Sequence, residues 1–218
     1  MKLVNMHDSK SCAFGPVGSS PTFGTNTMLQ RRVDKIALAY ITGAALGDGN
    51  LSNPNGRATR LRITCDNKYP KIIKVIKINL SKIMPKNKVA EIKKKKNCCD
   101  ISCYSNQWEK LLGWKAKSGS KIKQNIGIPK WIFQNKSTRI ACLRGLLDTD
   151  GSYYFDRGYL MINFVTMIPK LAKHTFELIK ITGYQPKIYH LKIKNQIRHN
   201  IRISKNTKNF VKLIKPNK

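Results

Sequence analysis

Two nine-residue stretches, ITGAALGDG at 41–49 and LRGLLDTDG at 143–151, decide the fold of this chain. Each is largely apolar, has a glycine at its third position and ends in Asp-Gly. The glycine of the first stretch, Gly43, recurs 102 residues later as Gly145, and the two Asp-Gly pairs have the same offset. A motif that recurs in this way indicates a duplicated structural unit.

The repeat extends well beyond the motifs. From Leu61 onward the two halves align at an offset of 99 without a gap, so Leu61 and Pro70 correspond to Leu160 and Pro169. Near the end of each half the offset returns to 102. These changes require only small differences in loop length. Several matches in the same order therefore favour duplication over chance similarity.

Hydrophobic periodicity predicts the same elements in each copy. An apolar helix ends at the motif, two strands follow, a helix begins at the proline, and two more strands and a short helix close the unit. The expected motif helices and later strands lie at 34–46, 138–148, 88–95, 99–104, 187–194 and 197–204. The predicted fold is α+β, with two pseudo-symmetric α-β-β-α-β-β-α units, an antiparallel β saddle and motif helices packed at the interface.

Composition suggests where the units begin and end. Residues 1–30 are rich in Gly, Ser, Pro, Thr and Asn and have no periodicity, so we expect a flexible N-terminal arm. The first unit is expected at 31–117 and the second at 137–218, joined by a linker at 118–136. Because both copies lie in one chain, we expect a pseudo-dimeric monomer.

The charge of the chain points to a polyanionic partner. Lys and Arg number 42 against 11 Asp and Glu, for a formal net charge of +31 over 218 residues. Clustered cations gain affinity by releasing counterions from phosphate, so nucleic acid is the favoured partner. The alternative is compositional drift, because Lys, Ile and Asn are all plentiful, as AT-rich coding would produce.

No membrane association is expected from the sequence. No apolar run approaches the ~20 residues that span a bilayer, and the first residues lack a secretory signal pattern. The chain is expected to be soluble and intracellular, in a bacterial or archaeal cytoplasm or an organelle.

The six cysteines form no CxxC pair and have no histidine at zinc-finger spacing. We expect free thiols in a reducing compartment rather than a zinc site. They are Cys12, Cys65, Cys98, Cys99, Cys103 and Cys142.

Alternation in the last strands predicts sheets with one apolar and one cationic face. In 197–204, Ile and His alternate with Arg, Asn and Ser, and in 187–194 Tyr189, Leu191 and Ile193 alternate with His190, Lys192 and Lys194. Two such sheets could form a saddle for a duplex, with the lysines on its open face. For any single strand, a solvated outer face is an equal alternative.

The motifs themselves predict a metal site. Small residues at i, i+4 spacing, such as Gly43 and Gly47, let two helix backbones approach closely, which would bring Asp48 and Asp150 together at their C-terminal ends. Gly49 and Gly151, which follow these acids, suit the left-handed backbone that ends a helix. Carboxylates at a helix C-terminus are disfavoured by the helix dipole and by each other. A divalent cation resolves this conflict and can activate water for phosphodiester hydrolysis. We expect Mg²⁺, or another divalent cation such as Mn²⁺.

Both motifs resemble the LAGLIDADG motif of homing endonucleases, the second more closely than the first. Ser152-Tyr153 and the segment 128–131 (IPKW) also look familial. The resemblance implies a site-specific double-strand DNA endonuclease whose paired sheets contact a long site in the major groove. It implies that Asp48 and Asp150 are catalytic metal ligands, with the backbone carbonyls of Gly47 and Thr149 nearby.

The resemblance also implies further site residues. Lys205 matches a lysine that lies near the scissile phosphate, although its repeat partner is Cys103, which suggests unequal cleavage of the two strands. Asn67 matches a polar position at the base of the second strand, and Asp148 receives no catalytic role. Together with the basic sheet faces, this predicts DNA contacts from Arg60, Arg62, Asn67, Lys93, Lys95, Lys192, Lys194, Arg198, Asn200 and Arg202. The lysine run at 93–96 has an alternative interpretation as a solvated loop.

Two other functions are compatible with the sequence. The chain could be a maturase that binds intron RNA on the same fold without cutting, or a non-cleaving DNA-binding protein. The presence of both motif acids favours cleavage. The target sequence and the host element cannot be derived from the residues.

Overall fold

The structure, a computed structural model, describes residues 33–94, 97–194 and 196–218. The expected arm at 1–30 lies outside these residues, so the predicted unit boundaries stay a prediction. The first repeat consists of α1 (Lys35–Asp48), β1 (Gly49–Ser52), β2 (Arg60–Asp66), α2 (Pro70–Ile83), β3 (Val89–Lys93), β4 (Cys98–Tyr104) and α3 (Trp108–Leu112). The second consists of α4 (Lys136–Thr149), β5 (Gly151–Asp156), β6 (Tyr159–Thr166), α5 (Pro169–Ile181), β7 (Lys187–Ile193), β8 (Gln196–Ile203) and α6 (Thr207–Ile214). A short 3₁₀ helix, η1 (Lys130–Gln134), precedes α4.

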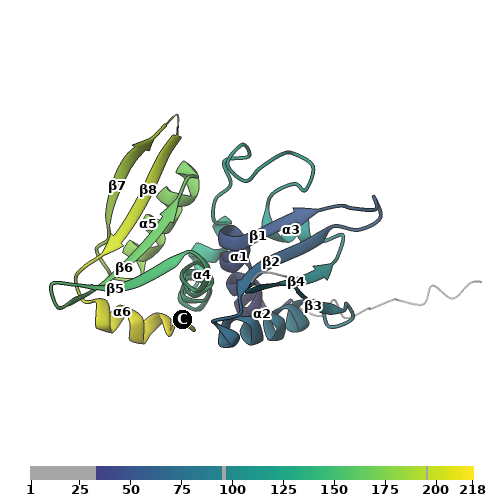
Figure 1. The fold of residues 1–218 in the computed structure, drawn as a ribbon, viewed down its shortest axis with the longest axis horizontal. Coiled ribbons are helices and arrows are strands. Elements are labelled where there is room, and N and C mark those ends of the chain that lie inside the picture. The colour runs from purple at the N-terminus through teal and green to yellow at the C-terminus, as the bar shows by residue number, and fades with distance from the viewer. Residues whose placement is uncertain (1–32, 95–96, 195) are drawn as a thin grey trace, which may run out of the picture. The chain divides into compact units, whose positions relative to one another are not determined.

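The two sheets have the same topology, as duplication requires. Their strand orders are β1-β2-β4-β3 and β5-β6-β8-β7, and all pairs are antiparallel. Figure 1 shows the sheets on either side of the central helices α1 and α4. The predicted α+β fold with a repeated α-β-β-α-β-β-α order is therefore confirmed.

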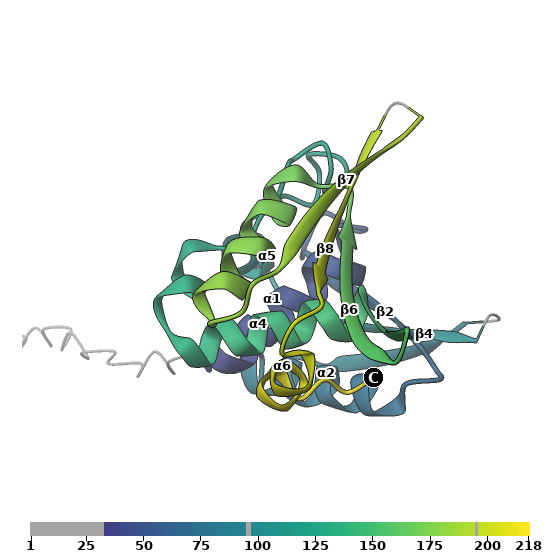
Figure 2. The same ribbon diagram turned by 90° about the vertical axis from the view of Figure 1, so that its left-hand side faces the viewer.

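Local chemistry explains where the helices begin. The Asp34 carboxylate accepts hydrogen bonds from the backbone N–H groups of Ile36 and Ala37, both at 3.0 Å, and so caps α1. Both α2 and α5 begin at a proline, whose missing N–H is not needed in the first turn. One apolar stripe of each helix is buried, and Figure 2 shows α5 beside strands β7 and β8 of its sheet.

The motif helices pack closely through their glycines. A Cβ atom on Gly43 would collide with the carbonyl oxygen of Cys142, and one on Gly145 would collide with that of Tyr40. Because each glycine faces the backbone of the opposite helix, the predicted close approach is present.

The glycines after the motif acids act differently from our expectation. We expected a left-handed backbone at Gly49 and Gly151 that would end each helix, but Gly49 has φ −83° and ψ 154° and already belongs to β1. A Cβ atom on Gly49 would collide with Ala45, and one on Gly151 with Leu147. The chain thus passes directly from helix to strand, and glycine is needed for space rather than for φ.

The register also corrects the predicted face of Lys192. Residues paired across antiparallel strands share a sheet face. Lys192 pairs with Ile197, on the face covered by α5. The prediction of an open-face lysine was wrong here, because alternation alone does not say which half of the pattern faces the helices. Lys93, in the basic run, pairs with Cys99 on the side of α2. Lys194 lies after β7 with φ 52°, and Lys95 lies outside the described residues.

Two smaller expectations concern cysteines and membranes. The five cysteines in the described part are free, and four of them are buried. Cys12 lies outside that part. None of the helices that the structure describes is both long and apolar enough to cross a bilayer.

The packing of α1 on α4 yields a stability prediction. We expect Gly145→Ala to lower the free energy of unfolding by about 1–3 kcal/mol or more, because the added methyl must push the helices apart. Chemical denaturation would measure the loss. Ser81→Ala, on an exposed face of α2, is the control and should change stability little. An unchanged midpoint for Gly145→Ala would contradict the close packing.

Candidate active site

The two motif aspartates lie together at the C-terminal ends of α1 and α4. Asp48 is the last residue of α1, and Asp150 is the first residue after α4. A Cβ atom on Gly47 would lie 3.0 Å from a carboxylate oxygen of Asp150, so the second acid touches the end of the first helix. The parallel packing of the two helices thus creates a site with two carboxylates.

The electrostatics of this site disfavour two negative charges. Burial and the nearby charge of Asp48 raise the pKa of Asp150 to about 6. Although the Asp48 side chain is partly open to solvent, loss of hydration also raises its pKa, against the opposing effect of Lys121 and Lys218. The free protein therefore holds at least one of these acids in an unfavourable ionised state at neutral pH.

Two lysines that the sequence did not single out bind the ends of the motif helices. The Lys121 ammonium donates to the backbone carbonyl oxygens of Leu46 at 2.8 Å, Ala45 at 3.2 Å and Gly47. Cations at a helix C-terminus are stabilised by the dipole and by the unpaired carbonyls. Burial lowers the pKa of Lys121, while both aspartates oppose that effect.

Lys218 binds the C-terminal end of α4 in the same way. Its ammonium donates to the carbonyl oxygens of Thr149 and Gly151, both at 2.6 Å. Each lysine follows the last helix of its own repeat and returns to the motif of that repeat. Sequence reasoning missed them because they occupy different offsets in the two halves, and no local motif surrounds either one.

Asp148 has a structural role, consistent with its exclusion from catalysis. Its carboxylate accepts a hydrogen bond from the Tyr40 hydroxyl at 2.8 Å, which links α4 to α1. It also accepts from the backbone N–H of Asn217 at 2.7 Å and from its side-chain amide at 2.6 Å. These bonds hold the segment that carries Lys218 beside the site.

A small cavity of about 200 Å³ opens beside Asp48. Thr64 and Asp66 from β2 line it, together with Thr149 and Lys218. The polar residue at the base of β2 that faces this cavity is Asp66, whereas the predicted Asn67 is an exposed residue of the following turn.

Lys205 is not brought to the acids. It is an exposed residue between β8 and α6, and no side-chain hydrogen bond joins it to a motif residue in the part of the chain that the structure describes. Its expected role stays a prediction, and Lys121 and Lys218 are the basic groups that the fold brings to the motifs.

The remaining candidate DNA contacts fall on the open sheet faces. Arg60 and Arg62 lie on the open face of the first sheet, where Arg62 lies 3.7 Å from the buried carboxylate of Asp100. Arg198, Asn200 and Arg202 lie together on the open face of the second sheet.

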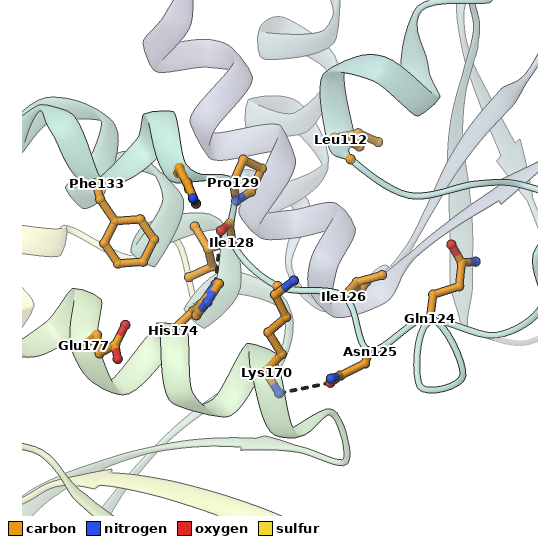
Figure 3. Close-up of a pocket in the computed structure, with 13 residues that line it drawn as sticks. Leu112, Gln124, Asn125, Ile126, Ile128, Pro129, Phe133, Lys170, His174 and Glu177 are labelled. Atoms are coloured by element: carbon orange, nitrogen blue, oxygen red, sulfur yellow. Dashed lines mark hydrogen bonds between the residues drawn. The ribbon is translucent and has the colours of Figure 1, made fainter.

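A second cavity, of about 480 Å³, has no connection with the motif acids. Figure 3 shows it between the 124–130 segment and α5. The His174 Nδ1–H donates a hydrogen bond to the Ile128 carbonyl oxygen, 3.1 Å away, and the imidazole meets the Phe133 ring edge to face. Its polar groups are thus engaged in joining α5 to the segment before α4.

The donor set at the motifs fits a Mg²⁺-type ion. Mg²⁺ is commonly bound by one or two carboxylates, with water and substrate phosphate completing the shell. The structure offers the carboxylates of Asp48 and Asp150 and the carbonyls of Gly47 and Thr149, which already bind ammonium groups. Among the described residues, no cluster of three or more His, Cys, Asp or Glu side chains offers a softer site.

Comparison with known proteins supports the fold through structure alone. No family model matches the sequence, and no curated protein matches it either. I-DmoI in complex with DNA and Mn matches at a TM-score of 0.62 and 17% identity, over 83% of this chain and 96% of that one. Mesophilic variants of the homing endonuclease I-DmoI match at a TM-score of 0.60 and 16% identity, over 83% and 95%. The N-terminal LAGLIDADG domain of DUF199/WhiA matches at 0.56 and 15%, over 83% and 82%.

These similarities define the class of the fold. The chain has the LAGLIDADG fold, with two copies of the unit and one acidic motif at the end of each central helix.

The raised pKa of Asp150 predicts a pH-dependent stability in metal-free protein. The folded chain keeps this proton up to about pH 6, while the unfolded chain releases it near pH ~4. Stability should therefore fall as pH rises between these values. We expect Asp150→Asn to be more stable than the parent by about 1–3 kcal/mol at pH 7 in EDTA, and nearly equal to it below pH ~4.

Denaturation at a series of pH values would measure this difference. Glu177→Gln, which removes an acid away from the motifs, is the control and should show no such pH-dependent gain. A constant difference between Asp150→Asn and the parent across the pH range would contradict the assigned burial of this carboxyl.

Proposed function

We propose that this protein is a metal-dependent endonuclease that cleaves double-stranded DNA at a long, specific site. The observation that carries the proposal is the joining of Asp48 and Asp150 at the ends of two packed helices. Open sheet faces carrying arginine and asparagine extend from this point on both sides. The net charge of +31 suits a phosphate backbone.

The proposed roles follow from the chemistry of each group. The carboxylates of Asp48 and Asp150 would hold the divalent ion, with the carbonyls of Gly47 and Thr149 beside it. When bound, the ion supplies a water of lowered pKa and stabilises the leaving oxygen. Structures of I-DmoI with Mn, Ca and Mg support the choice of a divalent cation.

Lys121 and Lys218 would act before and during the reaction. In the free chain their ammonium groups bind the carbonyls at the two helix ends and offset the charge of the acids. With a divalent ion and the DNA backbone bound, the same ammonium groups would remain beside the two acids. They would then offset the negative charge that develops there.

A second candidate function is binding of DNA without cleavage. The two ammonium groups already offset the charge at the motif ends in the free chain without a metal. The same fold occurs in the N-terminal LAGLIDADG domain of DUF199/WhiA. The alternative of an intron-RNA maturase rests on the sequence alone.

Cleavage of a randomised duplex library in Mg²⁺ would separate these functions. We expect the parent to cut a long, rare site. Asp48→Asn and Asp150→Asn should bind the same site but cut it at least ~100-fold more slowly, because each removes a ligand of the ion. Glu177→Gln is the control and should cut at the parent rate. Selective binding without metal-dependent cutting would leave the non-cleaving function as the better account.

The lysines provide a separate prediction about metal binding. We expect Lys121→Met to bind Mn²⁺ at least several-fold more tightly in the absence of DNA, because it frees the Gly47 carbonyl and removes a positive charge beside both acids. Titration calorimetry would measure the affinity. Lys123→Met, an exposed neighbour, is the control. Weaker binding by Lys121→Met would show that the lysine organises the site instead of competing for it.

A further inference from the structure

The open face of the second sheet differs from that of the first in having two asparagine oxygens without a hydrogen-bond partner among the described residues. In the first sheet, the buried Asp100 binds Thr64 at 2.7 Å and Lys94 at 2.8 Å and lies near Arg62, so the polar groups there bind one another. In the second sheet, the side-chain oxygens of Asn163 and Asn200 are buried and have no protein partner in the described part of the chain. Such acceptors lose free energy unless a ligand supplies a donor.

These two asparagines lie close to the proposed cleavage centre. Gly151, which follows the motif acid, pairs with Phe164, and Phe164 pairs with Ile201. Phe164 and Ile201 form one row of paired residues across the sheet. Asn163 lies in the row on one side of it, and Asn200 lies in the row on the other side. Both asparagines face the open side of the sheet. The Asn163 amide nitrogen donates to the Tyr154 hydroxyl at 3.0 Å. An asparagine amide that turns toward a duplex matches adenine, which offers N6–H and N7 in the major groove.

This face carries apolar side chains as well as the cations Lys187, Arg198 and Arg202. Tyr189, Leu191 and Ile193 of β7 share it with Asn200 and Arg198, and they are 43%, 44% and 38% exposed. We had expected these three residues on the helix side. Exposed aliphatic side chains on a DNA-facing surface are suited to the thymine methyl group, which projects into the major groove.

Arginine or lysine can contact guanine in the major groove. Arg202 is partly engaged, because it donates to Asp156 at 2.8 Å and lies over the Tyr154 ring at 6.0 Å. Arg198, farther toward the β7–β8 hairpin, has no ion pair among the described residues, and the exposed Lys187 pairs with Arg202. Any G·C pair in this half-site is therefore expected at Arg198 or Lys187.

We propose that the second sheet recognises an A·T-rich half-site, with Asn163 and Asn200 contacting adenines near the centre and Leu191 and Ile193 contacting thymine methyls farther out. The inference rests on the proposed function, since it needs DNA on the open faces. It goes beyond that function by assigning base composition to one half of the target. Recognition of the other half involves Arg60 and Arg62 and carries no such preference.

Selection of bound duplexes from a randomised library, without Mg²⁺, would test this independently of cleavage. The parent should enrich a site with one A·T-rich half. Asn200→Arg should change one A·T pair in that half, near the centre, to G·C, because arginine matches guanine. Asn50→Arg, on the open face of the first sheet, is the matched control and should change only the other half.

Affinity measurements on an alanine variant provide a second test if the arginine variant folds poorly. Asn200→Ala should weaken binding to the selected site by about 5- to 150-fold and lose discrimination at one base pair. The inference is overturned if neither Asn200 variant changes base preference, or if the half-site they affect is G·C-rich in the parent selection. Cleavage in Mg²⁺ is assayed separately, so a protein that selects the A·T-rich half without cutting loses only the proposed endonuclease activity.

Discussion

The contact between the backbones of α1 and α4 is the constraint on which the rest of the structure depends. Gly43 faces the carbonyl of Cys142, and Gly145 faces that of Tyr40, so neither helix can carry a side chain at the contact. Parallel helices at this short separation end at the same level. Two carboxylates that are 102 residues apart in the chain therefore meet in one site.

The same contact creates an electrostatic problem that the chain solves with its own cations. Two acids at the negative ends of two helices repel each other and are disfavoured by the helix dipoles. Lys121 and Lys218 arrive from segments after the last helix of each repeat and bind the exposed carbonyls. The Asp148 carboxylate holds Asn217 and so positions the second of these lysines. In the free protein the two lysines thus offset the charge of the acids.

The two repeats keep the same arrangement of helices and strands, but the open faces of their sheets differ. The two sheets share strand order and antiparallel pairing, because both must pack a helix on one face and meet a motif helix at one edge. Their open faces face solvent and are free of that constraint. One holds a network around a buried aspartate, and the other holds asparagines, tyrosines and aliphatic side chains. An asymmetric surface of this kind suits an asymmetric target.

The sequence alone determined the duplication, the order of elements and the identity of the paired acids, because these depend on local periodicity and on a motif present twice. It did not determine which face of β7 is covered by a helix. Tyr189, Leu191 and Ile193 alternate with polar residues, and this alternation is the same whichever set faces the helix. Only the pairing of β7 with β8 decides between the two faces. It misassigned Gly49, whose extended φ follows from its crowding against Ala45. Only the tertiary structure brought Lys121 and Lys218 to the motifs, because contacts across some 70 residues leave no local pattern in the chain.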